Sequence, residues 1–293
     1  AYACLLSTAV WYVYATNGPD ECIRISVREL EYLRQHGIGK APHHDKKGRH
    51  APFPYALFKF SQAWAVILAH AAFNFGRYFV YNSLLQFYVE ELGTSAVAAG
   101  QHILVGQIFD CIGKFGFAPF ADRAIRNNPS SRTKVRKVIS GTAFVAFAAS
   151  MAGLAVSYSV AAATCWLIVA KIASSAHVCG FKSNYLDLTQ THNGVLTGVG
   201  NMIATFASTV SPLLGGSLLD GSRRGWESMF LTIGLLDLGA AAFWCVFASG
   251  DGIDDKVLAA KECDSPRTVT EDPESTTVVS PAVGKARKSA AVV

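Results

Sequence analysis

Five polar side chains follow one another at helical spacing within an otherwise apolar stretch, residues 62–86. His70, Asn74, Arg77, Tyr78 and Tyr81 stand at positions i, i+4, i+7, i+8 and i+11, so a helix would carry them on one stripe. A guanidinium presents a planar fork of donors that suits phosphate and carboxylate oxygens, and neutral donors beside it can orient the bound group. The stripe therefore predicts an anion-binding surface.

Arg77 is the member of this stripe that costs most to place in a membrane. It lies about 15 residues into the stretch, or about 22 Å at 1.5 Å per helical residue. A charge at the centre of a membrane helix costs roughly 2.5–3.5 kcal/mol on insertion scales, so it needs a compensating environment. Two interpretations remain open. Arg77 lines a water-filled cavity, or it reaches the outer headgroups or a neighbouring helix.

Other charged residues lie inside apolar stretches. Asp110 and Lys114 stand four residues apart, a spacing that lets them neutralise each other along a helix or take part in a proton relay or substrate binding. Lys171 lies in the middle of another stretch with no acid nearby in the sequence. Together with Arg77, these residues leave two positive charges inside the membrane, which favours an anionic substrate if the side chains share a cavity.

The segments that position these side chains are predicted to be transmembrane helices. Each passage through a bilayer needs about 20 predominantly apolar residues and excludes charge. The sequence therefore predicts an all-α fold, a polytopic bundle embedded in lipid. Stretches of this kind lie at 1–15, 62–86, 97–120, 137–157, 160–181, 194–219 and 229–249.

The basic residues are concentrated on alternate connections between these stretches. Eight lie in 17–61, five in 121–136, one in 182–193 and six after residue 250. By contrast, none lies in 87–96 and two lie in 220–228. Because Lys and Arg are enriched in cytoplasmic loops of membrane proteins, the four basic segments are predicted to be cytoplasmic.

This arrangement predicts the organisation of the chain. Residues 1–16 would be the end of a sixth transmembrane helix, 17–61 a cytoplasmic linker and 62–249 a six-helix bundle. Residues 250–293 are rich in Ser, Thr, Pro, Glu and Lys with few aromatics, so a disordered cytoplasmic tail is expected. The whole is typical of the second half of a twelve-helix carrier, whose partner would be an N-terminal six-helix half of the same protein.

Composition excludes several other classes of protein. Apolar residues make up 51% of the chain and the mean hydropathy is +0.28, more hydrophobic than an ordinary soluble domain. The net charge of +5 lies in connections and is not interleaved with aromatics, so nucleic-acid binding is not expected. The seven cysteines are scattered without metal-ligand spacing, and no nucleophile and base are paired. We expect no metal site, no cofactor and no enzyme activity.

Several segments in order along the chain carry a resemblance, and the first is Leu68-Ala-His-Ala-Ala-Phe-Asn-Phe-Gly-Arg-Tyr78. This segment is similar to the opening of the seventh helix in the anion/cation symporter family of the major facilitator superfamily, which includes sialin, vesicular glutamate transporters, type I sodium–phosphate cotransporters and plant plastid carriers. The sequence departs from the family pattern at Phe75, where the family has Trp, and at Thr189, where its Pro is missing. The seventh-helix arginine of the vesicular glutamate transporters falls on Phe73. The other similar segments, in order and correctly spaced, are Phe120–Arg123, Thr133–Lys137, Ser183–Leu188, Gly194–Asn201, Trp226–Phe230 and Phe247–Gly250.

The resemblance implies a secondary active carrier of inorganic phosphate or a small organic anion, with Na+ or H+ as the coupling ion. A receptor-like or degenerate carrier that does not transport is the alternative. The residues expected to bind substrate are Arg77, Asn74, Tyr78, His70, Asn184 and Asn201, and the candidates for coupling or gating are Asp187, Asp110, Lys114 and Lys171.

Overall fold

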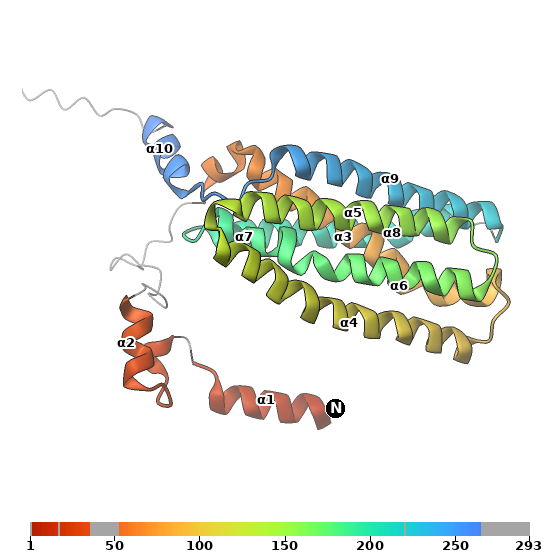
Figure 1. Cartoon of the computed structure of the whole chain (residues 1–293), viewed down its shortest axis with the longest axis horizontal. Helices are drawn as coiled ribbons and strands as arrows, with labels where there is room; N and C mark the ends of the chain where they lie inside the picture. The colour runs from red at the N-terminus through yellow and green to blue at the C-terminus, as the bar shows by residue number, and fades with distance from the viewer. Residues whose placement is uncertain (1, 17, 36–52, 220, 265–293) are drawn as a thin grey trace, which may run out of the picture.

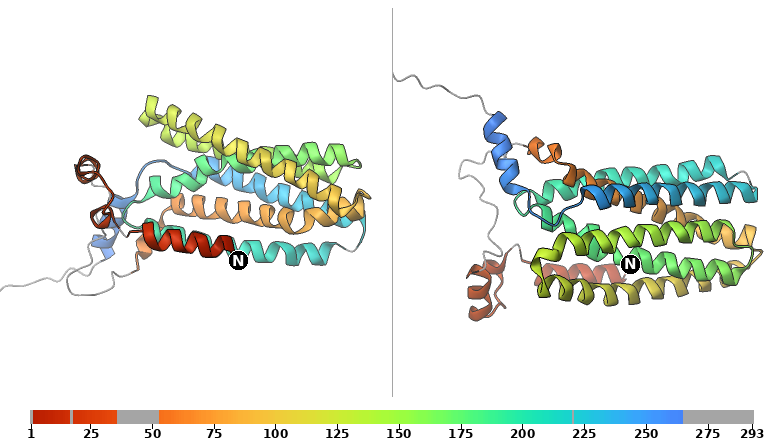
Figure 2. Two further views of the ribbon diagram at one scale, coloured as in Figure 1. Left: turned by 90° about the horizontal axis from the view of Figure 1, so that it is seen from below. Right: turned by 45° about the horizontal axis from the view of Figure 1, so that its top comes forward.

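The computed structural model describes residues 2–16, 18–35, 53–219 and 221–264, and every regular element in these ranges is helical (Figure 1). The predicted all-α fold is therefore confirmed. Long helices run side by side and form one bundle, which Figure 2 shows from two further sides. They are α3 (Ser61–Gln86), α4 (Ala96–Asn127), α5 (Arg132–Ala155), α6 (Val160–Ala176), α8 (Asn193–Leu218) and α9 (Arg223–Phe247).

The helix that carries the polar stripe, α3, lies at the centre of these contacts. It packs most extensively along α8 and also along α9, while α5 packs along α9 and α6, and α4 lies mainly on α6. Glycine permits close approach at two of these crossings. A Cβ at Gly76 of α3 would lie 2.7 Å from Ile233 Cγ2, and one at Gly113 of α4 would collide with Ser175 Oγ. Small residues at such positions are typical of helix packing in membranes.

The chain is an integral membrane protein that crosses the bilayer more than once. Four helical segments in the described part are long and apolar enough to span it: Ala96–Asn127, Pro129–Ala155, Val160–Leu188 and Arg223–Phe247. The outward surface of α4 bears large apolar side chains such as Leu104, Ile108 and Ile112, which suit contact with lipid. The helices α3 and α8 have 26 residues each and complete the bundle; that they also span the membrane stays a prediction.

The interior of the bundle is filled by two aromatic-rich clusters. One surrounds Phe79, Phe87, Trp226 and Phe230 near the end of α3 and the start of α9, where the Phe87 and Phe230 ring centroids are 5.1 Å apart and nearly perpendicular. The other lies toward the opposite end of α3 and contains Phe73, Phe144, Phe181 and Trp244. These clusters hold α3, α5 and α9 together on both sides of the bundle's middle.

The stretch predicted at 160–181 is longer and is interrupted in the structure. After α6 comes one wide turn, η5 (Val178–Lys182), and then α7 (Ser183–Leu188). Gly180 has non-helical dihedrals (φ −96°, ψ −112°), and a Cβ there would collide with Ser140 Oγ of α5. The Phe181 N–H donates to that same Ser140 oxygen at 2.8 Å, so the break is stabilised by a side chain of the neighbouring helix.

The prediction that the chain is disordered from residue 250 onward is wrong for its first part. Residues Asp254–Asp264 form α10, and Ile253 and Val257 are buried in the cluster that contains Leu57 of a short turn before α3, η2 (Tyr55–Lys59). The amino-acid composition of this segment indicates disorder, but its tertiary contacts with the bundle stabilise a helix. The remainder of the predicted tail, 265–293, lies outside the described residues.

Among the described residues, two α-helices precede the bundle. The first, α1 (Tyr2–Tyr14), has no buried residue, and the second, α2 (Val27–Gln35), begins after Ser26, whose Oγ accepts from the Glu29 N–H at 3.2 Å. Asp20 pairs with Arg34 of α2 at 2.6 Å. Most of the rest of the predicted linker, 36–52, lies outside the described residues.

Candidate functional site

A cavity of about 520 Å³ opens beside the polar stripe of α3. We call it the first cavity. Three elements line it, since α3 supplies most of the wall, α4 supplies one lysine and η5 supplies the rest. Four of the five stripe residues lie together there, as their helical spacing predicts. The lining residues are Phe73, Asn74, Arg77, Tyr78, Tyr81, Lys114, Val178 and Lys182.

Arg77 combines the two interpretations that the sequence left open. Its guanidinium lines the first cavity, and it also pairs with Asp110 of α4, with Nη2 and Oδ2 separated by 3.8 Å. Its Cζ lies 5.3 Å from the ring centroid of Phe73 and 5.6 Å from that of Tyr81, so two aromatic rings hold the cation at the cavity wall. Arg77 therefore has an acidic partner, although that partner comes from another helix.

Asp110 is the acid at the centre of this cluster. Lys114 Nζ contacts its Oδ2 at 2.7 Å, which confirms the i,i+4 pair predicted from the spacing. The carboxyl is buried, and within the described residues its Oδ1 has no hydrogen-bond partner. One carboxylate thus faces both Arg77 and Lys114 and cannot neutralise both.

Lys171 belongs to the same cluster but lies behind the cavity wall. Its side chain is 6% exposed, and its Nζ sits 4.4 Å from the ring centroid of Tyr81. The Tyr81 hydroxyl in turn accepts a hydrogen bond from Gln107 Nε2 at 2.5 Å. Lys171 therefore contacts the far face of a cavity residue and is not itself part of the lining.

Lys182 is a cavity residue that sequence reasoning missed. The sequence predicts that it belongs to the basic connection 182–193, yet the wide turn η5 brings it to the first cavity, where its Nζ lies 4.6 Å from the ring centroid of Phe73. Arg77 and Lys182 therefore contact the same ring. In the sequence, Lys182 stands directly after an apolar run, which could have indicated a position near the bundle interior. The break at Gly180 is what directs the residue toward the cavity, and the sequence does not predict that break.

The remaining predicted residues of α3 and α8 line a second cavity of about 380 Å³. His70 Nδ1 and the Tyr185 hydroxyl are 3.2 Å apart there, and Asn201 of α8 also lines the cavity. Thr197 donates to Asn193 Oδ1 at 3.1 Å. The full lining is His70, Lys182, Tyr185, Leu186, Asn193, Thr197 and Asn201.

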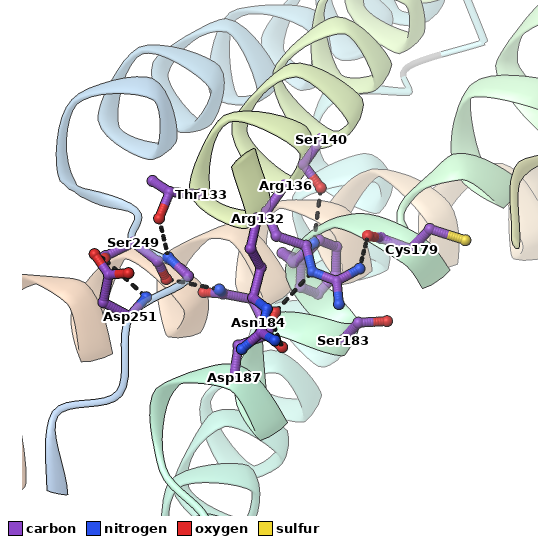
Figure 3. A network of polar contacts seen from close by, with 12 residues as sticks. Arg132, Thr133, Arg136, Ser140, Cys179, Ser183, Asn184, Asp187, Ser249 and Asp251 are labelled. Carbon is purple, nitrogen blue, oxygen red and sulfur yellow. Dashed lines mark hydrogen bonds and ion pairs between the residues drawn. The ribbon is translucent and has the colours of Figure 1, made fainter. Parts of the chain in front are cut away.

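Asn184 and Asp187 lie apart from both cavities, in a polar network at the α7 end of the bundle (Figure 3). Asn184 is fully buried, and its Nδ2 donates to the Ser249 carbonyl at 2.7 Å. Asp187 Oδ2 accepts from Arg136 Nε at 2.7 Å, and Arg136 Nη1 reaches the Cys179 carbonyl at 2.5 Å. Asn184 thus has a structural partner where substrate contact was expected, whereas a gating role of Asp187 stays a prediction.

One further buried acid was overlooked. Asp237 lies inside α9 and is 2% exposed, and within the described residues its Oδ2 has no hydrogen-bond partner. It lines neither cavity. Among the described residues, no three His, Cys, Asp or Glu side chains are grouped as ligands for a metal ion.

Comparison with known proteins gives a consistent set of relatives, although no protein-family model matches the chain. A probable vesicular glutamate transporter of Caenorhabditis elegans is 28% identical over 83% of this chain. A probable chloroplastic anion transporter of Oryza sativa subsp. japonica is 28% identical over 84%, and human vesicular glutamate transporter 2 is 24% identical over 83%. The matched region covers 42%, 47% and 42% of these relatives, so the chain spans less than half of their length.

Proposed function

We propose that this chain, which is similar to vesicular glutamate transporters and to a plant anion transporter, belongs to the anion/cation symporter family of the major facilitator superfamily and forms part of a secondary active carrier of small anions. The cargo is inorganic phosphate or a small organic anion, and a gradient of Na+ or H+ drives it. The bundle forms one half of the carrier, and an N-terminal six-helix half supplies the opposite wall of the site. Rocking of the two halves about the site gives alternating access.

The observation that carries this proposal is the charge of the first cavity. Arg77, Lys114 and Lys182 all reach its wall, and the acid paired with the first two is Asp110. Three cations and one carboxylate leave two positive charges in a site of low dielectric, where unbalanced charge is costly. An anion that enters the cavity supplies the missing charge.

Each lining residue makes a different kind of contact with the bound anion. The Arg77 guanidinium offers two parallel donors to a phosphate or carboxylate, and Lys114 and Lys182 act as point charges. Asn74 and Tyr78 lie on the same wall and orient the bound group by hydrogen bonds. Asp110 competes with the substrate for Arg77 and Lys114, which keeps binding reversible.

Asp110 is also the best-placed group for coupling. Its Oδ1 has no partner in the described part of the chain, and it sits between two substrate-binding cations. A proton or Na+ taken up by this carboxylate would weaken its hold on Arg77 and Lys114 and so favour binding of the anion. Lys114 and Lys171 contribute to the same electrostatic balance, while Asp187 acts at the α7 end as a gate.

Uptake by the full-length protein in proteoliposomes tests the proposal. Labelled phosphate and a panel of labelled organic anions are offered with and without an inward Na+ or pH gradient. We expect saturable accumulation of at least one anion, enhanced by one of the two gradients and abolished when the gradient is collapsed. Accumulation of no anion under any gradient would contradict the proposal. Binding of an anion without uptake would instead support the receptor-like alternative.

A further inference from the structure

The two cavities adjoin, and Lys182 is the one residue that their described linings share. Its Nζ contacts the ring of Phe73, and Arg77 of the first cavity contacts the same ring. A lysine ammonium has three donors on a flexible stem, so it can serve groups in either cavity. The wide turn at η5 places it at this junction.

The second cavity differs from the first in its chemistry. Apart from Lys182, its polar lining consists of a histidine, a tyrosine hydroxyl, a threonine hydroxyl and two amides. Asn201 is exposed at this cavity, and its amide has no hydrogen-bond partner among the described residues, so its donor and acceptor are both accessible to a ligand. These groups suit a polar substituent that carries no charge, since charged ligands are bound by residues of opposite charge.

The shape of the second cavity depends on one glycine. A Cβ at Gly200 of α8 would collide with the hydroxyl of Tyr185, so the absence of a side chain lets this hydroxyl approach α8. There the hydroxyl also lies 3.2 Å from His70 Nδ1. Tyr185 and His70 thereby form a fixed part of the wall of the second cavity.

We propose that Lys182 joins the two cavities into one divided binding site. The anionic group of the substrate binds to Arg77, Lys114 and Lys182, and an uncharged polar group of the same substrate binds beside Asn201 and Thr197. The proposal rests on the proposed function and names the residues that select among anions. A bare anion fills the first cavity alone and leaves the open groups on α8 unused.

The test compares pairs of probes that differ in the uncharged part. Inorganic phosphate is paired with glycerol 3-phosphate, and propionate with lactate. The half-saturating concentration of each probe is measured for uptake by the full-length carrier in proteoliposomes. We expect the hydroxyl-bearing member of at least one pair to bind about threefold to tenfold more tightly, the range of a single hydrogen bond.

Two sets of variants separate the parts of the site. Asn201→Leu and Thr197→Val should reduce the preference within a pair to about one, because they remove the groups that recognise the hydroxyl. Lys182→Gln should raise the half-saturating concentration of all members about tenfold or more, and Lys182→Arg should restore part of the loss. Arg126→Gln, at an exposed position of α4, is the matched charge control. The amount of inserted protein is measured for each variant.

The outcomes distinguish failure of the divided site from failure of the carrier function. An unchanged preference in Asn201→Leu and Thr197→Val, or unchanged affinities in Lys182→Gln, would overturn the divided site while the carrier function stands. The same holds if wild-type protein transports anions but shows no preference within either pair. Uptake of no anion by the wild-type protein would overturn the proposed function and the divided site with it.

Discussion

At the scale of single residues, the most consequential side chain is Arg77. It meets Asp110, Phe73 and Tyr81 and still faces the first cavity. We expect Arg77→Lys to raise the half-saturating concentration of the anion by one to two orders of magnitude, because the planar fork is lost while the charge stays. Arg77→Ala should abolish uptake but leave membrane insertion intact, since a costly charge is removed. Uptake per inserted molecule is the measurement, and near-normal uptake with poor insertion would show a structural role instead.

The second prediction at this scale concerns Asp110. Its carboxylate holds Lys114 at 2.7 Å and Arg77 at 3.8 Å, so under the proposed function it would compete with the substrate for both. In Asp110→Asn the cations are released, and we expect a lower half-saturating concentration together with a lower maximal rate, because the anion leaves more slowly. Initial uptake rates over a range of concentrations check both parts. Weaker binding in this variant would show that Asp110 positions the cations and does not compete for them.

The sequence predicted those residues whose relations are local. Helical spacing was sufficient to place Asn74, Arg77 and Tyr78 on one wall and to pair Asp110 with Lys114, since both relations exist within a single helix. It could not place Lys182 or Asn184. Their surroundings depend on how the chain breaks at Gly180 and on which neighbouring helix lies opposite, and the spacing along one helix contains no information about either.

At the scale of elements, the interrupted helix α6–η5–α7 is the segment most sensitive to a small change. Gly180→Ala would drive a Cβ into Ser140 Oγ and force the turn to move. We expect the thermal midpoint of the solubilised protein to fall by several degrees, in keeping with a loss of about 1–3 kcal/mol for an overpacked site. Ser140→Ala removes that oxygen but also the acceptor of the Phe181 N–H, so it lowers stability by itself and serves as the second background. Gly180→Ala should cost less in the Ser140→Ala background than in the wild-type one, and an equal cost in both backgrounds would show that the contact is unimportant.

Docking of α10 provides the second prediction at this scale. Burial by itself would raise the pKa of the Asp254 carboxyl, but hydrogen bonds from Thr189 Oγ1, the Gln190 and Thr191 amides and His192 outweigh it and lower the pKa below its usual value. A carboxyl with a lowered pKa stabilises the folded state above its unfolded pKa, and the stabilisation is lost as pH falls through the lowered value. We therefore expect α10 to stay docked at neutral pH and to loosen in acid.

The matched variants Asp254→Asn and Asp255→Asn test this contact. Replacing Asp254 should weaken docking by about 1.5–3 kcal/mol, the range for hydrogen bonds to a charged group, and so speed tryptic cleavage at Lys256. Asp255 is exposed and serves as the control. Equal cleavage rates in the two variants would mean that the carboxyl does not hold the helix. This helix was not predicted, because its stability comes from contacts with η2 and the α7–α8 connection and not from its own composition.

At the scale of the whole molecule, the prediction concerns orientation in the membrane. The basic segments should face the cytoplasm, because the alternation of Lys and Arg between connections sets the topology. In a variant without the seven native cysteines, Arg28→Cys and Asp255→Cys should resist an impermeant maleimide applied outside intact cells, whereas Thr94→Cys should react. Reversed labelling would refute the orientation. The bundle itself was predictable at this scale, since apolar length and charge placement are global properties of the sequence.

The excess positive charge of the first cavity has an electrical consequence. When the site moves from one side of the membrane to the other, its charge moves through the membrane potential, which does work of about 2.3 kcal/mol per elementary charge per 100 mV. In the proposed carrier a bound anion lowers the net charge of this half, whereas the empty site carries the uncompensated charge of Arg77, Lys114 and Lys182 against Asp110. If the carrier function and the predicted orientation hold, we expect the return of the empty site to be the voltage-sensitive step, with a cytoplasm-negative potential holding the empty cations toward the cytoplasmic side.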